Sequence, residues 1–166
     1  DHQDLHSFPT RRSSDLPESA YATTSSDTFG LPVEDTAAAV FRYENGMIAE
    51  VTTSWAFAAA DTSIEIYGTE GTILLGGVDI ASRPTRESEF LRVFRREAGG
   101  GSWASSPTVP HFKTGVFHEH VAWAFVQALR EGGPMPVTLD DGRQAFAMID
   151  AAYRSVRSGR AEPVKA

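Results

Sequence analysis

Short strands joined by tight turns, between residues 33 and 75, constrain the fold of this chain more than any other stretch. Strand-like segments occupy residues 33–43, 47–57, 63–67 and 72–75. Asn45-Gly46 predicts a two-residue type I′ turn, because both residues tolerate the positive φ that this turn requires. Gly68 and Gly71 bracket a second tight turn at Thr69-Glu70. The stretch is therefore predicted to form an antiparallel meander.

Apolar and polar side chains alternate along the second segment, and a strand sends alternate side chains to opposite faces. One face carries Met47, Ala49, Val51 and Trp55, and the other carries Glu50, Thr52 and Ser54. With Ile64 and Ile66 added, the apolar set exceeds what one layer of helices would hide. An uncovered apolar face predicts that the chain self-associates through its sheet.

Further strands are predicted on both sides of this stretch, at Glu18–Ser25 and Val78–Ser82. Glu89–Arg96 alternates without a wholly apolar face, which predicts an outer strand whose Arg stems cover apolar surface. Ala98–Pro110 is rich in Gly, Ser and Pro, and is predicted to be the longest loop. Trp103 within it is a candidate lid residue.

Two helices follow the strands. The first, Gly115–Glu131, carries an apolar stripe of Phe117, Val121, Phe125 and Leu129. The second begins with a capping box at Thr138 and Asp141 and ends near Gly159. Its predicted apolar positions are Phe146, Ile149, Tyr153 and Val156. Strands in a run followed by helices in a run predict an α+β fold, with an open antiparallel or mixed sheet and helices packed on one face.

Composition excludes several partner classes. The 166 residues carry a net charge of −7, and no run of Lys or Arg exceeds two residues, so nucleic acid is not an expected partner. No apolar run approaches the length of a membrane span, so no membrane partner is expected. The chain has no cysteine, which excludes disulfides and thiolate metal sites and fits a reducing compartment. A cytoplasmic location is therefore expected.

The first sixteen residues differ from everything that follows. Residues 7–16, SFPTRRSSDL, look like a sequencing-library adaptor translated as protein. We expect residues 1–16 to be a spurious segment, or alternatively a disordered tail, and residues 17–166 to be the domain. On the first interpretation the true chain upstream of Pro17 is missing. His2 and His6 have the spacing of a metal pair, but such a tail cannot hold ligand geometry.

Several short motifs carry a family resemblance. They are Glu34-Asp35-Thr36, Glu44-Asn45-Gly46, Ser54-Trp55, Gly68-Thr69-Glu70-Gly71-Thr72, Val137-Thr138, Asp141-Gly142-Arg143 and Ala151-Ala152-Tyr153-Arg154-Ser155. In this order and spacing, from Glu18 to Val164, the chain resembles the C-terminal domain of the Gfo/Idh/MocA oxidoreductases. Members of that family, among them inositol dehydrogenase, transfer hydride between NAD(P) and a sugar or polyol carbon. The resemblance also implies a homo-oligomer, because the family's C-terminal sheet is commonly its oligomer interface.

The family's cofactor needs a strand-to-helix turn rich in glycine, whose N–H groups hold the pyrophosphate. The sequence contains no G-x-G-x-x-G, and Gly99-Gly100-Gly101 has no strand–helix context, so it is interpreted as a flexible linker. The family's Glu-Lys-Pro motif and its His/Asp pair also have no counterpart. We therefore assign no catalytic, cofactor-binding or metal-binding residue here. NAD or NADP is expected in a full-length protein, and none is expected on this fragment, which should be inactive alone.

Substrate-binding candidates cluster where the long loop enters the first helix, and a hydroxylated sugar or polyol needs donors and acceptors of this kind. This cluster contains His111, Lys113 and His118, with His120 nearby, and Trp55 is a separate candidate whose ring could stack on a sugar face. Ordinary polar positions for the histidines, and a core or interface position for Trp55, remain open. His118 and His120 point apart on a helix, so they are not expected to share a metal.

Two alternatives to the enzyme interpretation stay open. The chain could be a free-standing, non-catalytic binding or oligomerisation module. It could also be a carbohydrate-binding module built on the sheet that carries Trp55. The DNA sequence upstream of Pro17 would distinguish the free-standing module from a truncated oxidoreductase. Sugar binding without cofactor would favour the carbohydrate-binding module.

Overall fold

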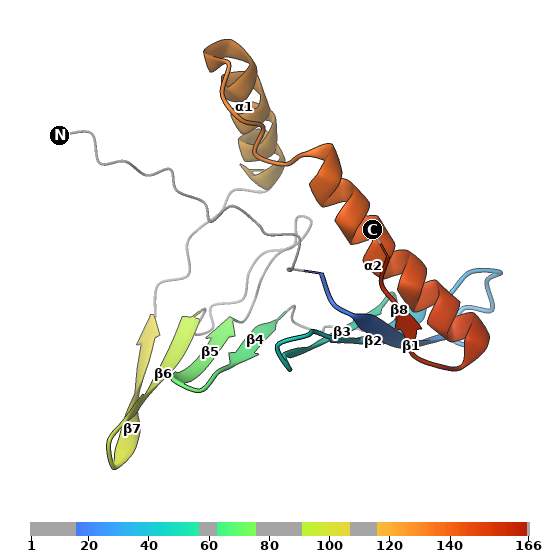
Figure 1. Cartoon of the computed structure of the whole chain (residues 1–166), viewed down its shortest axis with the longest axis horizontal. Coiled ribbons are helices and arrows are strands. Elements are labelled where there is room, and N and C mark those ends of the chain that lie inside the picture. The colour runs from blue at the N-terminus through green and yellow to red at the C-terminus, as the bar shows by residue number, and fades with distance from the viewer. Residues whose placement is uncertain (1–15, 57–62, 76–90, 107–115, 166) are drawn as a thin grey trace. The chain divides into compact units, whose positions relative to one another are not determined.

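The computed structural model describes residues 16–56, 63–75, 91–106 and 116–165, with the backbone alone at 106 and 116–118 (Figure 1). The chain divides into two compact units, one made of residues 1–58 and 137–166 and the other of residues 59–136. Each unit holds one four-stranded antiparallel sheet and one helix, which confirms the α+β class. The strand predicted at Val78–Ser82 lies outside the described residues.

The first sheet joins strands from both ends of the chain. Its members are β1 (Ser19–Ser25), β2 (Thr36–Arg42), β3 (Ile48–Ser54) and β8 (Glu162–Pro163), in the order β3-β2-β1-β8. All pairs are antiparallel, and Ala39 on β2 stands between Ala22 on β1 and Val51 on β3. The predicted strand at Glu18–Ser25 is confirmed, with a shift of one residue at its start.

The turn between β2 and β3 differs from the predicted type. Tyr43 N–H donates to the Met47 carbonyl, and Gly46 N–H donates to the Tyr43 carbonyl, at 2.9 and 3.0 Å. The loop therefore contains the three residues 44–46, with Gly46 at a φ of 82°. This matches the hairpin type in which a β-turn is followed by a left-handed glycine, so the two-residue type I′ turn was wrong. The hairpin itself is confirmed.

Helix α2 (Leu139–Ser158) begins and ends as the sequence predicts. The Thr138 hydroxyl accepts from Asp141 N–H, and the Asp141 carboxylate accepts from Thr138 N–H at 2.9 Å. Gly159 ends the helix in the left-handed region, at φ 66°, and its N–H donates to the Ser155 carbonyl. Both capping devices satisfy backbone groups that a helix end leaves without intrahelical partners.

The buried stripe of α2 is not the predicted one. Ala147, Ala151 and Ser155 are its buried residues, while Phe146 and Ile149 remain 68% and 53% exposed. Small side chains four residues apart let the helix lie close against the sheet. There Ala151 packs with Ala20 of β1 and Phe41 of β2, surrounded by Ala39, Tyr43, Ala49, Met148 and Val164. The prediction failed because it ranked positions by side-chain size, whereas close approach selects small residues.

The second sheet is a four-stranded meander. Its strands are β4 (Ile64–Tyr67), β5 (Gly71–Leu75), β6 (Leu91–Glu97) and β7 (Gly100–Ser106), paired in that order. The register places Ile66, Ile73, Val93 and Ala104 in one row and Ile64, Leu75 and Leu91 in the next. One face of this sheet is therefore apolar. The opposite face carries Glu65, Tyr67, Thr72, Arg92, Phe94 and Trp103.

The predicted single meander over residues 33–75 is thus divided between two sheets. The β2–β3 and β4–β5 hairpins are confirmed, but β3 and β4 each stand at the end of a different sheet. Met47 and Val51 consequently do not share a face with Ile64 and Ile66. Alternation fixes the two faces of each strand, but it does not fix which strands pair across the connection after Trp55.

The predicted loop at Ala98–Pro110 and the predicted outer position of β6 were both wrong. Residues 100–106 form β7, so β6 lies between β5 and β7. Gly99, at φ 90°, turns the hairpin, and Gly101 lies where a Cβ would come within 2.2 Å of the Phe94 ring. Of the three glycines that suggested a linker, Gly99 is therefore a turn residue and Gly101 a close-contact residue.

Helix α1 (Val116–Glu131) confirms the first predicted helix to within one residue. Gly132 follows it at φ 65°, and Gly133 N–H donates to the Ala128 carbonyl at 3.1 Å. This is the glycine stop that the sequence predicts. Val121, Phe125 and Leu129 of the predicted stripe are 67%, 51% and 59% exposed.

Candidate functional site

The predicted substrate-binding residues are only partly described. His111 and Lys113 lie outside the described residues, and His118 is placed by its backbone in the first turn of α1. Trp55 follows β3 directly and is 87% exposed, so it is not a core residue of its own unit. The grouping of these four residues stays a prediction.

Trp55 is held in place through its backbone. Its N–H donates to the Asp35 carbonyl at 2.8 Å. One residue earlier, the Ser54 hydroxyl shares a 2.8 Å hydrogen bond with Thr36 and accepts from Ala56 N–H. These bonds fix the chain around Trp55 at the point where β2 begins and β3 ends. The indole therefore leaves a rigid support while its ring stays open to solvent.

Asp35 is a buried carboxylate with a structural task. It accepts hydrogen bonds from Thr28 N–H at 3.0 Å, Phe29 N–H at 3.1 Å and the Thr36 hydroxyl at 2.9 Å. Burial alone would raise the pKa of Asp35, but the hydrogen bonds, led by that from Phe29, outweigh it and hold the pKa below its ordinary value. The carboxylate closes the loop that precedes β2, so it is not a candidate acid or base.

The neighbouring Glu34 makes a separate contact with α2. The Tyr153 hydroxyl donates to its carboxylate, which lowers the pKa of Glu34 and raises the pKa of Tyr153. The two adjacent carboxylates thus have different partners, consistent with their expected opposite directions on a strand. Sequence reasoning missed the Tyr153 contact, because it counted that residue among the apolar positions of the helix.

Three aromatic residues are therefore tied to one dipeptide. Phe29 and Trp55 bond to Asp35 through their backbones, and Tyr153 bonds to Glu34 through its hydroxyl. We call these five residues the Glu34–Asp35 corner. Phe29 is 54% exposed and Tyr153 is 41% exposed. The corner therefore offers aromatic surface beside the carboxylate of Glu34, which is only partly buried. Such a surface can stack on an apolar ring face and accept hydrogen bonds from hydroxyl groups.

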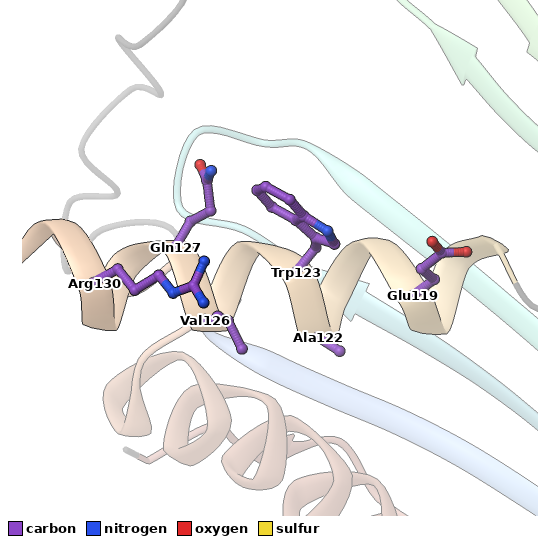
Figure 2. Close-up of a pocket in the computed structure, with 6 residues that line it drawn as sticks. All are labelled: Glu119, Ala122, Trp123, Val126, Gln127 and Arg130. Atoms are coloured by element: carbon purple, nitrogen blue, oxygen red, sulfur yellow. The ribbon is translucent and has the colours of Figure 1, made fainter.

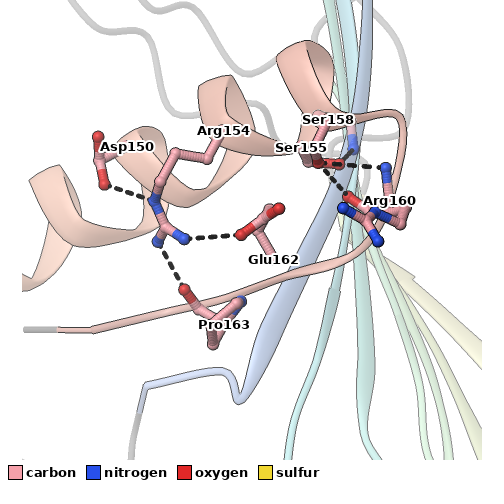
Figure 3. Close-up of polar contacts among 8 residues, drawn as sticks. Asp150, Arg154, Ser155, Ser158, Arg160, Glu162 and Pro163 are labelled. Carbon is pink, nitrogen blue, oxygen red and sulfur yellow. Dashed lines mark hydrogen bonds and ion pairs between the residues drawn. The ribbon is translucent and has the colours of Figure 1, made fainter.

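A second polar cluster joins α2 to the chain's last strand (Figure 3). Arg154 Nε lies 2.9 Å from the Asp150 carboxylate, and one terminal nitrogen lies 3.0 Å from the Glu162 carboxylate. The other donates to the Pro163 carbonyl at 2.6 Å. The guanidinium thus uses its fork of donors to fix β8 beside the helix, which is a structural role.

A shallow pocket lies along α1 (Figure 2). The described residues that line it all belong to this helix: Glu119, Ala122, Trp123, Val126, Gln127 and Arg130. Figure 2 shows Glu119 toward one end, Arg130 toward the other and Trp123 between them. A groove with this lining suits a helix or strand of a protein partner better than a reacting small molecule.

The described part of the chain carries neither a metal-binding cluster nor a membrane-spanning helix. No group of three or more His, Cys, Asp or Glu residues there is placed to hold a metal ion. No helix in that same part combines the length and apolar character needed to cross a membrane.

The described residues also do not fit a dinucleotide. None of the described glycine-rich turns leads from a strand into a helix, and Gly99–Gly101 belongs to the β6–β7 hairpin. The backbone cradle that a pyrophosphate requires is therefore not formed by this part of the chain.

Several solved structures share the fold of this chain. The chain is 23% identical to an oxidoreductase from Agrobacterium radiobacter solved with NAD+, L-tartaric acid and magnesium, at a TM-score of 0.64, and the match covers 91% of this chain and 44% of that one. The chain is also 23% identical to the WlbA dehydrogenase from Bordetella pertussis, solved with NADH and UDP-GlcNAcA. The TM-score is 0.65, and the match covers 91% of this chain and 41% of that one. Levoglucosan dehydrogenase, solved with NADH and L-sorbose, is 20% identical to the chain at a TM-score of 0.71. That match covers 90% of this chain and 45% of the dehydrogenase. The fold is that of one domain of such oxidoreductases.

The family follows from a second comparison. The model of the C-terminal alpha/beta domain of the GFO_IDH_MocA oxidoreductase family matches residues 10–166, so the chain belongs to this family. No curated protein sequence matches it. The chain spans less than half the length of these solved relatives.

Proposed function

We propose that this chain is the substrate-and-assembly domain of an NAD(P)-dependent oxidoreductase that acts on a sugar, a polyol or a related hydroxy compound. The observation that supports this most directly is the family match over residues 10–166. The fold likeness to dehydrogenases solved with NADH supports it as well. NAD is the cofactor we favour for the full-length protein, because these relatives were solved with NAD+ or NADH.

The reaction divides the work between two halves. In the full-length protein, NAD would supply the hydride acceptor for oxidation of a hydroxyl-bearing carbon of the substrate to a carbonyl, and a base would take the hydroxyl proton. The cofactor and the base belong, in this proposal, to the half that the relatives possess and this chain does not span. The chain's own residues bind and orient the hydroxylated substrate, and alone it is inactive.

The proposed substrate pocket draws on four residues of this chain. His111, Lys113 and His118 supply hydrogen-bond donors at the entrance to α1, and Trp55 supplies a ring for stacking. Trp55 is exposed and rigidly supported at the Glu34–Asp35 corner, so it is the first of the four residues to test. In the full-length enzyme, Trp55→Ala should raise KM for the substrate by more than Phe146→Ala, a control at an exposed aromatic residue of α2.

Assembly is proposed through the apolar face of the second sheet. Ile64, Ile66 and Ile73 on this face are 47%, 52% and 37% exposed, and Leu75, Leu91 and Val93 continue the same rows. Covering so continuous an apolar face favours association with a second copy. A cytoplasmic location belongs to the same proposal, and cell fractionation tests it.

The test begins with the source DNA upstream of Pro17. An in-frame strand, glycine turn and helix there would support the truncated oxidoreductase, whereas a stop codon or an unrelated gene would overturn it in favour of a free-standing module. A fluorescence titration of this chain with NADH follows. Negligible NADH binding is expected, and micromolar binding would contradict the proposal that the cofactor site belongs to the other half of the full-length protein. Sugar binding without cofactor would instead favour the carbohydrate-binding module.

A further inference from the structure

Helix α1 carries apolar side chains on more than one side. The predicted stripe of Val121, Phe125 and Leu129 occupies one side. Trp123, which is 58% exposed, lies on another side, about 120° or more from each residue of this stripe. Val126, which is 44% exposed, borders both sides, about 140° from Val121 and about 60° from Leu129. A helix with a single buried face needs only one such stripe, so the second side calls for a partner of its own.

The second side is the groove of Figure 2, and its chemistry is symmetric along the helix. Trp123 and Val126 lie at equal distances from the midpoint between Ala124 and Phe125. Ala122 and Gln127 are likewise equidistant from this midpoint, as are Glu119 and Arg130 at the two ends. A twofold axis perpendicular to the helix, lying beside that point and between two copies, would therefore place each residue opposite its counterpart on the second helix.

This pattern is complementary to itself. An antiparallel second helix would bring Glu119 of one copy to Arg130 of the other, at both ends of a contact about 16 Å long. Trp123 of each copy would meet Val126 of the other at the centre. Opposite charges would then flank an apolar middle, the arrangement that fixes register at an interface with a polar rim. A parallel helix would instead place Glu119 beside Glu119.

We propose that the groove formed by Glu119, Ala122, Trp123, Val126, Gln127 and Arg130 is an isologous interface, filled by the same helix of a second copy in antiparallel orientation. The contact is separate from the sheet face and does not depend on the oxidoreductase proposal. Burial of Trp123 and Val126 stabilises it, and the two charge pairs select orientation and register.

A charge-swap cycle on the full chain tests the proposal, read by sedimentation equilibrium. Glu119→Arg and Arg130→Glu should each weaken association roughly tenfold, because each places like charges at both ends of the contact. The double variant should restore association to within a few fold of wild type. Glu131→Arg, which changes the same charge outside the groove, is the matched control. Failure of the double variant to restore association, or a monomer at all concentrations, would overturn the proposal.

Cysteine pairing tests register independently, because the natural chain has no cysteine. Antiparallel packing brings residue 119 of one copy to residue 130 of the other, and it keeps the two copies of either residue about 16 Å apart. Mixed Glu119→Cys and Arg130→Cys proteins should therefore oxidise to the mixed dimer faster than either protein oxidises alone. Both positions are exposed, and circular dichroism checks that the helix content is unchanged. Equal rates, or faster self-pairing of each variant, would contradict the antiparallel arrangement even if the chain associates through its sheet.

Discussion

The two units solve the problem of an apolar sheet face in different ways. In the first, α2 lies on the sheet and buries Ala20, Ala22, Phe41, Ala147 and Ala151 to less than one-tenth exposed. In the described part of the second, no residue reaches that degree of burial, and its apolar rows remain partly open. The first unit has a core of its own, whereas the second presents a surface that calls for a partner.

The difference teaches that small residues, rather than large ones, define the self-contained unit. Ala147, Ala151 and Ser155 bring the α2 backbone close to β1, where the Ser155 hydroxyl accepts from Ala22 N–H at 3.0 Å. The second unit places Ile, Leu and Val on its open face instead. A substitution at the tightest contact of one unit should therefore lower the stability of that unit more than the stability of the other.

The largest effect is expected where α2 touches the sheet. Ala151→Phe inserts a ring at a position with no exposed surface, so it should destabilise the first unit by about 3 kcal/mol or more. Ala145→Phe, at an exposed position of the same helix, is the control and should cost much less. Urea unfolding followed by amide resonances from each sheet measures both. Equal effects of the two variants would argue against a close helix–sheet contact.

A backbone contact sets the next effect, in the second unit. A Cβ at Gly71 would come within 2.0 Å of the Phe94 carbonyl oxygen, whereas a Cβ at Gly68 would meet its nearest neighbour at an ordinary 3.6 Å. Gly71→Ala should therefore destabilise the β4–β5–β6 sheet by about 1–3 kcal/mol, and Gly68→Ala by much less. If Gly71→Ala lowered the unfolding midpoint of the first unit as much as that of the second, the two units would not unfold independently.

A smaller loss is expected from the hydrogen bond between helix and strand. Ser155→Ala removes the acceptor of the buried Ala22 N–H, so the first unit should lose about 1–2 kcal/mol. Ser158→Ala, at an exposed serine in the last turn of the same helix, should change stability little. Thermal unfolding by circular dichroism compares them. A loss no greater than that of the control would mean that the Ala22 amide finds another acceptor.

The smallest effect is a change in pH dependence at the Glu34–Asp35 corner. The folded pKa of Asp35 lies below its unfolded value, so ionised Asp35 stabilises the fold above about pH 4, and this contribution is lost as the pH falls through the folded pKa. Asp35→Asn should therefore be less stable than wild type at pH 7, and the difference should narrow in acid. Asp27→Asn is the control. Parallel stability curves from pH 7 to pH 3 would contradict this role of Asp35.

The local parts of the fold were predictable from the sequence because their signals are local. The Thr138 capping box, the Gly159 stop and both hairpins depend on residues within a few positions of one another. The division into two sheets was missed, because pairing across the connection after Trp55 depends on distant partners. The β7 strand was missed because Gly100 and Gly101 suggested a loop. At Gly101, the Phe94 ring, seven residues earlier in the chain, and the Arg95 carbonyl oxygen explain why glycine is needed.

The candidate site was less predictable than the fold. The exposure of Trp55 could not be read from its alternation with Ser54, since both a core strand and an open edge give that pattern. Asp35 and Tyr153 were in the sequence motifs, but their hydrogen-bond partners lie on a different loop and a different element. Such contacts are set by tertiary packing, which spacing along the chain does not encode.

The composition of β7 has a consequence for aggregation. Among the described strands it pairs with β6 alone, so its other edge offers backbone donors and acceptors to any passing strand. That edge reads Gly-Gly-Ser-Trp-Ala-Ser-Ser, a stretch with low β-propensity and few side chains to support an added strand. Growth by strand addition at this edge, the route to amyloid-like polymers, is thereby discouraged.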